Sequence, residues 1–197
     1  MKYSLVSATI LAGLLAACGE AQVDTTTDAP APPPPSEAAD EATGSESIPS
    51  MLNARAMIVS GESTVIGEAN LNEGPNGVLM RITLNPGALE PGWHGLHLHQ
   101  IGDCSDYGVF TNSGGHVGKV EGGHGLLNAD GPEGGDLPNI WVASDGSAGY
   151  EAFTTLTSAS ELLDEDGSAI IIHEGEDDHM SQPIGGAGGR VACGVIN

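Results

Sequence analysis

The sequence predicts an all-β domain, a sandwich or barrel, over residues 51–197. Short stretches rich in Val, Ile and Leu recur there between turn signals, as is typical of such folds. Glycine is abundant, with 30 residues in the chain, and runs of helix-forming residues are nearly absent. Two long Gly-rich or acidic segments, 101–138 and 174–189, do not fit strands. Long loops in a compact domain are usually functional, so we expect the chemistry to lie in these two.

Eight strands account for the apolar stretches. A strong hairpin signal, Gly-Pro-Asn-Gly, lies at 74–77 between two of them. Residues 158–163 predict one helical turn. The expected strands cover 54–59, 64–71, 78–84, 92–100, 139–143, 149–157, 169–173 and 190–196.

The first 17 residues predict a signal peptide. Lys2 precedes an apolar run over 5–17 that is too short to span a bilayer comfortably. The run ends in Leu-Ala-Ala-Cys at 15–18, which resembles the bacterial lipobox, where the cysteine is lipidated and becomes the first mature residue. Cys18 is therefore the expected lipidation site and membrane anchor. The alternative is an ordinary signal peptide cleaved nearby, with Cys18 unmodified.

Residues 18–50 predict a lipidated cysteine followed by a disordered tether. The stretch after Cys18 holds seven acidic residues, no basic ones and four consecutive prolines at 32–35. With almost no bulky apolar residues it cannot bury a core, so we expect a solvated, partly extended linker.

The charge of residues 51–197 excludes one class of partner. Twenty acidic residues stand against four basic ones, which are Arg55, Arg81, Lys119 and Arg190. Such a surface repels the phosphate backbone, so no nucleic acid is expected as a partner. Cys104 and Cys193 remain once Cys18 is assigned, and in an exported protein this pair predicts a disulfide.

The histidines gather in one part of the chain. All seven lie between His94 and His179. In Trp-His-Gly-Leu-His-Leu-His at 93–99, the strand period of two places His97 and His99 on one face and His94 on the other. Two adjacent imidazoles can bind one metal ion, but the pair alone is also compatible with a purely structural role.

Five ordered motifs resemble the copper-zinc superoxide dismutase family. The segment 92–104 looks like its copper-binding strand, and Ser-Gly-Gly-His at 113–116 resembles the segment holding the imidazole shared by both metals. Gly-Asp-Leu-Pro-Asn at 135–139 resembles the end of the zinc loop, and Ile-His-Glu at 172–174 the strand end with the last copper ligand. Residues 189–196 resemble the C-terminal signature. The resemblance runs from about residue 54 to the end and implies an eight-stranded Greek-key β-barrel.

The resemblance also implies a function and a copper site. Superoxide would be converted to dioxygen and hydrogen peroxide as bound copper is alternately reduced and oxidised. Arg190 would attract and bind the anion, and His116 would bridge copper and zinc and take up a proton. His94 matches a structural histidine of the family. The implied copper ligands are His97, His99, His116 and His173.

The zinc site departs from the family pattern. His116, His124 and Asp136 match zinc ligands, but Glu133 stands where the family has a further histidine. Three arrangements are open: Glu133 ligates zinc, water fills the fourth position, or zinc is absent and copper works alone. His179 is an alternative ligand or a solvated surface residue. Asp177 matches the residue that links a copper histidine to a zinc histidine.

The implied location is the cell envelope or periplasm of a Gram-negative-type bacterium. Gly19 after the cysteine gives no inner-membrane retention signal, which favours the outer membrane. Family members are monomers or dimers, so a homodimer is one expectation. The competing function is a non-catalytic copper-binding or storage module built on the same barrel.

Overall fold

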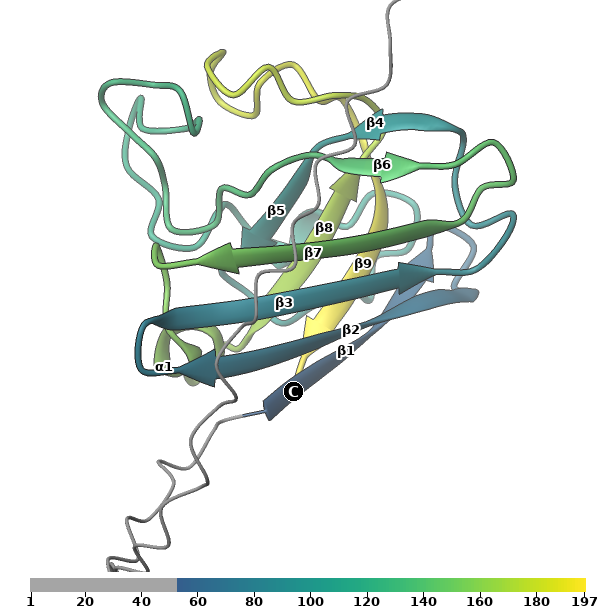
Figure 1. Ribbon diagram of the computed structural model, residues 1–197, viewed down its shortest axis with the longest axis horizontal. Helices are drawn as coiled ribbons and strands as arrows, with labels where there is room; N and C mark the ends of the chain where they lie inside the picture. The colour runs from purple at the N-terminus through teal and green to yellow at the C-terminus, as the bar shows by residue number, and fades with distance from the viewer. Residues whose placement is uncertain (1–52) are drawn as a thin grey trace, which may run out of the picture. The chain divides into compact units, whose positions relative to one another are not determined.

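Antiparallel β-strands form nearly all of the regular secondary structure in the part of the protein that the structure, a computed structural model, describes (Figure 1). The described residues are 53–197. The predicted signal peptide, Cys18 and tether lie outside them. Within 53–197, no helix is long and apolar enough to cross a membrane.

Seven strands form one curled antiparallel sheet, in the order β5-β8-β9-β1-β2-β3-β7. The hairpin predicted at 74–77 joins β2 to β3, and the predicted helical turn is α1 (Ala159–Leu162), capped by Ser158. The strands of this sheet are β1 (Asn53–Ser60), β2 (Val65–Gly74), β3 (Gly77–Leu84), β5 (Leu96–His99), β7 (Ala148–Thr154), β8 (Ser168–His173) and β9 (Arg190–Ile196).

A second sheet of two strands, β4 (Gly92–His94) and β6 (Ile140–Val142), completes the fold. The strand expected over 92–100 is divided at Gly95, whose N–H donates to Gly175 O and whose carbonyl accepts from His173 N. A Cβ at Gly95 would lie 2.8 Å from Ala187 Cβ, so the loop before β9 packs directly on the break. The eight expected strands thus correspond to nine described ones, and the all-β barrel fold is confirmed.

The two faces of β8 separate the barrel core from the histidine cluster. Ile170 and Ile172 join the large core cluster inside the barrel. Ala169 and Ile171 belong instead to a small cluster with Phe110 and the disulfide cysteines. The β8–β9 pairing is irregular between Ile172 and His173, and beyond this point the His173 ring lies beside those of His97 and His99, with centroids 4.8 and 6.2 Å away.

The segment 101–138 runs back along the free edge of β5. Leu98 donates to Gly135 O and accepts from Val117 N, and Gln100 donates to Gly115 O. This pairing sets His116 opposite His99 and Asp136 opposite His97. The edge strand is therefore covered, and residues from the loop are brought beside the strand histidines.

The two long loops meet over this edge. In Figure 1 the teal-to-green loop before β6 and the yellow loop before β9 lie near each other at the upper left. They are joined by hydrogen bonds, among them Leu127 N to His179 O at 3.1 Å. The predicted disulfide between Cys104 and Cys193 is confirmed, and it ties the start of the first loop to β9.

Candidate metal centre

Four neighbouring imidazole rings in the described residues each have a buried nitrogen without a hydrogen-bond partner. These nitrogens are His97 Nδ1, His99 Nε2, His116 Nε2 and His173 Nε2. Ligand atoms of His97, His99 and His173 lie within 4.8 Å of one another, and the rings of His97 and His116 are 4.3 Å apart. An unpaired buried polar atom is costly, so four together indicate a site for a metal ion.

The second nitrogen of each of these rings is held by the protein. His99 Nδ1 donates to Gly114 O at 2.9 Å and His173 Nδ1 to Gly188 O at 3.1 Å. His97 Nε2 donates to Asp177 at 2.8 Å, and His116 Nδ1 donates to Glu133 at 2.6 Å. Each ring thus presents a lone pair to the centre of the cluster. Imidazole is a preferred donor for copper, and the four histidines predicted as its ligands fit that ion.

Burial lowers the pKa of three of these rings, His97, His99 and His173, and so favours the neutral form that ligates a metal. Burial, with a smaller contribution from neighbouring His97, lowers the pKa of His173 to about 3. Burial also lowers the pKa of His99 well below its ordinary value, with Arg190 adding to the effect. Neutral imidazoles at ordinary pH need lose no proton to bind a cation.

A second cluster adjoins the first on the far side of His116. His124 Nδ1 lies 2.9 Å from Asp136 Oδ1, and His116 Nδ1 lies 3.2 Å from the same oxygen. The other oxygen of Asp136 accepts from the backbone N–H of Gly125 and of Glu133. Ligand atoms of His97, His116, His124 and Asp136 lie within 4.8 Å of one another. Because His97 Nε2 is taken by Asp177, we assign His97 to the first cluster through its free Nδ1.

Glu133 borders the second cluster. Its side chain is only 3% exposed, and Oε2 lies 2.6 Å from His116 Nδ1. Glu133 thus adds a second carboxylate beside two imidazoles and Asp136, and these are residue types from which Zn²⁺ takes its ligands. Of the four residues predicted as zinc ligands, His116, His124 and Asp136 lie in this cluster, and Glu133 contacts it through His116.

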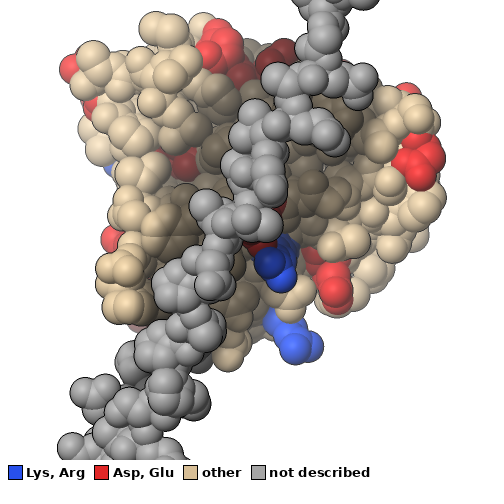
Figure 2. Space-filling model, viewed as in Figure 1, with Lys and Arg blue, Asp and Glu red and all other residues tan. Residues whose placement is uncertain are grey.

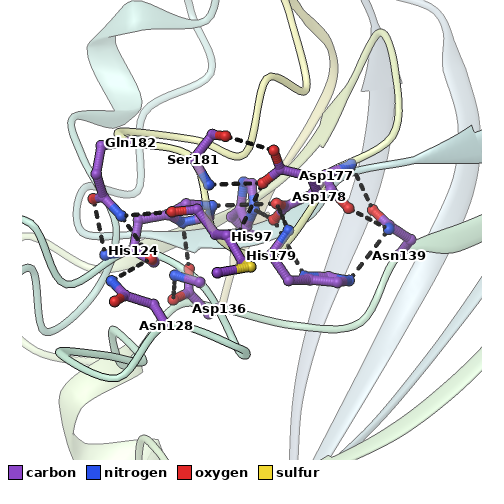
Figure 3. Close-up of polar contacts among 12 residues, drawn as sticks. His97, His124, Asn128, Asp136, Asn139, Asp177, Asp178, His179, Ser181 and Gln182 are labelled. Carbon is purple, nitrogen blue, oxygen red and sulfur yellow. Dashed lines mark hydrogen bonds and ion pairs between the residues drawn. The ribbon is translucent and has the colours of Figure 1, made fainter.

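Asp177 links the two clusters (Figure 3). Its Oδ2 accepts from His97 Nε2 at 2.8 Å, and its Oδ1 accepts from His124 Nε2 at 3.2 Å. Burial lowers the pKa of His124, but its hydrogen bonds to Asp136 and Asp177 outweigh this and raise the pKa to about 10. Without a metal, His124 is therefore a cation between two carboxylates.

Two residues that the sequence prediction missed hold this arrangement in place. Asn139 clamps the backbone of Asp177, donating to its carbonyl at 2.8 Å and accepting from its N–H at 3.0 Å. Gln182 does the same for His124, at 2.8 Å and 3.2 Å. The signal available for Asn139 is its position directly after Gly-Asp-Leu-Pro. Gln182 has no such signal.

The two remaining histidines belong to neither cluster. His94 Nδ1 and Nε2 face the carbonyl oxygens of His173 and Glu90 at 2.7 and 2.8 Å, so its position is structural. His179 is partly buried rather than solvated, with Nδ1 3.5 Å from Asp177 Oδ2 and Nε2 3.2 Å from Asn139 Nδ2. It packs on the linking aspartate.

A cleft of about 340 Å³ opens onto the first cluster. Its lining includes the histidines His99 and His116, the basic residues Lys119 and Arg190, and the acidic Glu133. Arg190 donates to Phe110 O at 2.6 Å, Ser113 Oγ at 3.0 Å and Gly114 O at 2.9 Å, all in the first loop. The guanidinium is thus fixed beside the histidines.

The cleft holds two of the four basic residues of the domain. Arg81, by contrast, pairs with Glu151 on the outer face of β3 and β7. Figure 2 shows that face, where acidic side chains are scattered around a largely uncharged surface. Positive charge beside the histidines, on an otherwise acidic domain, fits a small anion as the visiting molecule.

Comparison with known proteins agrees with this geometry. Residues 65–196 match the family described as copper/zinc superoxide dismutase (SODC). The chain is 45% identical, over 151 residues, to a protein of Caulobacter vibrioides named superoxide dismutase [Cu-Zn]; the match covers 73% of this chain and 85% of that protein. It is 40% identical over 151 residues to superoxide dismutase [Cu-Zn] 2 of Aquifex aeolicus, covering 74% and 86%.

Solved structures show the same fold. A crystal structure of a SOD-like protein from Bacillus subtilis matches with a TM-score of 0.63 and 34% identity, over 72% of this chain and 96% of that one. The Cu/Zn superoxide dismutase from Brucella abortus matches in fold with a TM-score of 0.61 and 24% identity, over 74% and 100%. Sequence, barrel and relatives agree, and the chain belongs to the copper/zinc superoxide dismutase family.

Proposed function

We propose that this protein is a superoxide dismutase with copper and zinc as cofactors. The observation that carries the proposal is the set of four unpaired imidazole nitrogens beneath a cleft that holds two cations. His97, His99, His116 and His173 hold the copper. When bound, copper supplies the one-electron chemistry that oxidises one superoxide and reduces the next.

The residues of the chain supply binding and proton control. Arg190 attracts superoxide into the cleft and binds it there, since the three oxygen acceptors of the first loop hold its guanidinium beside the histidines. His116 lies between the clusters, with Nε2 toward the copper side and Nδ1 toward Glu133 and Asp136. It is thus placed to take up and return a proton at Nε2.

Zinc is held by His116, His124, Asp136 and Glu133 in this proposal. Of the three arrangements open from the sequence, ligation by Glu133 is supported by its burial and its 2.6 Å approach to His116 Nδ1. Two carboxylates would neutralise the charge of the ion, which favours its binding in a buried site. Zinc would also replace the proton that His124 carries between Asp136 and Asp177.

The test is to load the full chain with both metals and to measure dismutation beside metal content. Stoichiometric copper with rapid dismutation is expected. Stoichiometric copper with negligible activity would contradict the proposal and favour the storage module. Zinc content separates ligation by Glu133 from its alternatives: Glu133→Ala should lose zinc, whereas Glu121→Ala, at an exposed glutamate of the same loop, should keep it.

The proposal includes a location in the cell envelope through a lipid on Cys18. The support is the lipobox-like sequence at 15–18 and the acidic, Pro-rich segment that separates it from the barrel. A lipid anchor with such a linker would keep the domain near the membrane. Incorporation of labelled fatty acid into the wild type but not into Cys18→Ser tests this. Fractionation of the membranes then shows whether the outer one carries the protein, as we propose.

A homodimer is also part of the proposal, with Trp93 and Trp141 as its contact surface. The two side chains are 49% and 51% exposed and pack edge to face, with ring centroids 5.0 Å apart. Exposed tryptophans are typical of interfaces, and two highly acidic copies approach most easily where charge is absent. Sedimentation should give a dimer for the wild type and a monomer for Trp141→Ser. A monomeric wild type at micromolar concentration would contradict it.

A further inference from the structure

The bridging position of His116 raises the question of what holds its ring when zinc is absent. His116 lies in the first loop, and its backbone pairs only with His99 across an isolated bridge. In a site with both ions, the metals themselves would orient the ring. Without zinc, the orientation depends on what contacts Nδ1.

Glu133 makes the closest contact with that nitrogen. Its Oε2 lies 2.6 Å from His116 Nδ1, whereas Asp136 Oδ1 lies 3.2 Å away. The carboxylate is itself fixed at its other oxygen, because Oε1 accepts from Val120 N at 3.1 Å. The backbone N–H of Glu133 donates to Asp136 Oδ2 at 2.9 Å. Both ends of the residue are therefore held.

This contact determines which nitrogen of His116 can bind copper. An ionised carboxylate only accepts hydrogen bonds, so Nδ1 carries the hydrogen and Nε2 presents its lone pair. Nε2 is one of the four unpaired nitrogens of the copper cluster. A carboxylate behind a metal-bound imidazole in this way fixes both the ring and the nitrogen used for binding.

A histidine at position 133 would not serve equally. A neutral imidazole has one acceptor nitrogen, whereas a carboxylate has two oxygens. Glu133 can therefore accept from Val120 N and His116 Nδ1 together. A histidine could accept from only one of them, so it would need zinc to hold His116.

We propose that Glu133 has a second role: in the zinc-free protein it holds His116 in position to bind copper, so that the copper site outlasts the loss of zinc. This inference rests on the copper ligands of the proposed function. It adds that the departure from the family pattern at position 133 uncouples copper binding from zinc occupancy.

The experiment compares copper affinity with and without zinc in the full chain. Wild type, Glu133→His and Glu133→Gln are loaded with copper alone or with both metals. The copper dissociation constant is measured by chelator competition, and the Cu(II) electron paramagnetic resonance spectrum reports the number of bound nitrogens. Glu121→His, at an exposed residue of the same loop, is the matched control.

We expect removal of zinc to change the copper affinity of the wild type and of Glu121→His by less than about threefold, with unchanged spectra. In Glu133→His, removal of zinc should raise the copper dissociation constant about tenfold or more and remove one bound nitrogen from the spectrum. Glu133→Gln, which keeps one acceptor oxygen, should fall between them. Equal losses for wild type and Glu133→His would overturn the inference.

The two proposals fail differently. If the copper ligands of the proposed function are wrong, the four-nitrogen spectrum will be missing from the wild type even with both metals bound. If only the present inference is wrong, that spectrum will be present with both metals and will lose a nitrogen when zinc is removed. Should Glu133→His not fold, a wild type that loses a nitrogen on zinc removal would still overturn the inference.

Discussion

Breaking the Cys104–Cys193 disulfide should lower the free energy of unfolding of the metal-free protein by about 4.6 kcal/mol. The bond joins residues 89 positions apart, so it closes a loop of that length in the unfolded chain. In the loop-entropy model such a closure removes about 15 cal/mol/K of entropy, or about 4.6 kcal/mol at room temperature. For a domain of this size, the melting temperature should fall by roughly 10–18 °C.

The folded state should change little when the bond is reduced. Both cysteines are buried with Phe110, Ala169 and Ile171, and two thiols occupy nearly the volume of the disulfide. The assay is urea unfolding of the metal-free protein with and without a phosphine reductant, with the dependence on urea fitted separately for each. A loss below about 1.5 kcal/mol with unchanged urea dependence would refute the reasoning.

A second consequence of reduction concerns zinc. The first loop carries His116, His124 and Asp136, and the disulfide ties its start to β9. Reduction should therefore weaken zinc binding before the barrel unfolds. We would follow zinc release and circular dichroism during titration with reductant. Simultaneous loss of both would contradict this order.

Three further predictions concern charge. Arg190→Met should lower the dismutation rate about tenfold or more with copper content unchanged, because it removes the cation fixed beside the histidines. Arg55→Met, at an exposed residue of β1, is the control, and a parallel loss of copper would contradict a role in anion binding. Added salt should raise the dismutation rate of the wild type, since it screens the repulsion between superoxide and a domain with 20 acidic residues. A rate that falls steeply with salt would contradict this and show that attraction of superoxide by the cations of the cleft dominates. The metal-free protein should be most stable near pH 6.5. Burial lowers the pKa of His173 to about 3, so the unfolded chain takes up a proton before the folded one, and stability falls as pH drops from 6.5 toward 3. His124 has a pKa of about 10 in the folded state, so its contribution to stability is complete below pH 6.5 and is lost as pH rises toward 10. Urea midpoints measured from pH 4 to 10 check this, with the metal-loaded protein as control; a metal-free midpoint that rises from pH 7 to 9 would contradict it.

Local periodicity explains what could be predicted directly. Alternation along a strand predicted His97 and His99 on one face, and both rings lie in the histidine cluster. His94 lies apart from them, as predicted, but on a separate strand beyond the break at Gly95. The hairpin at 74–77 and the cap of α1 also depend on neighbouring residues alone. These features follow from the sequence because the interactions that form them join residues a few positions apart.

The family resemblance brought the distant members of the site together. His116, His124 and Asp136 lie in a loop without periodicity, so spacing alone could not have placed them beside β5. The structure supplies the reason: backbone hydrogen bonds of Leu98 and Gln100 attach the loop to the edge strand.

The sequence by itself therefore determined the all-β class and the cysteine pair, and its resemblance to the family supplied the candidate metal ligands. Only the tertiary structure decided how those side chains are oriented. The break at Gly95, the clamp of Asn139 on Asp177 and the contact of Glu133 with His116 each join segments distant in the chain. Such contacts depend on how the two long loops pack on each other and on β5, and no local pattern encodes that packing.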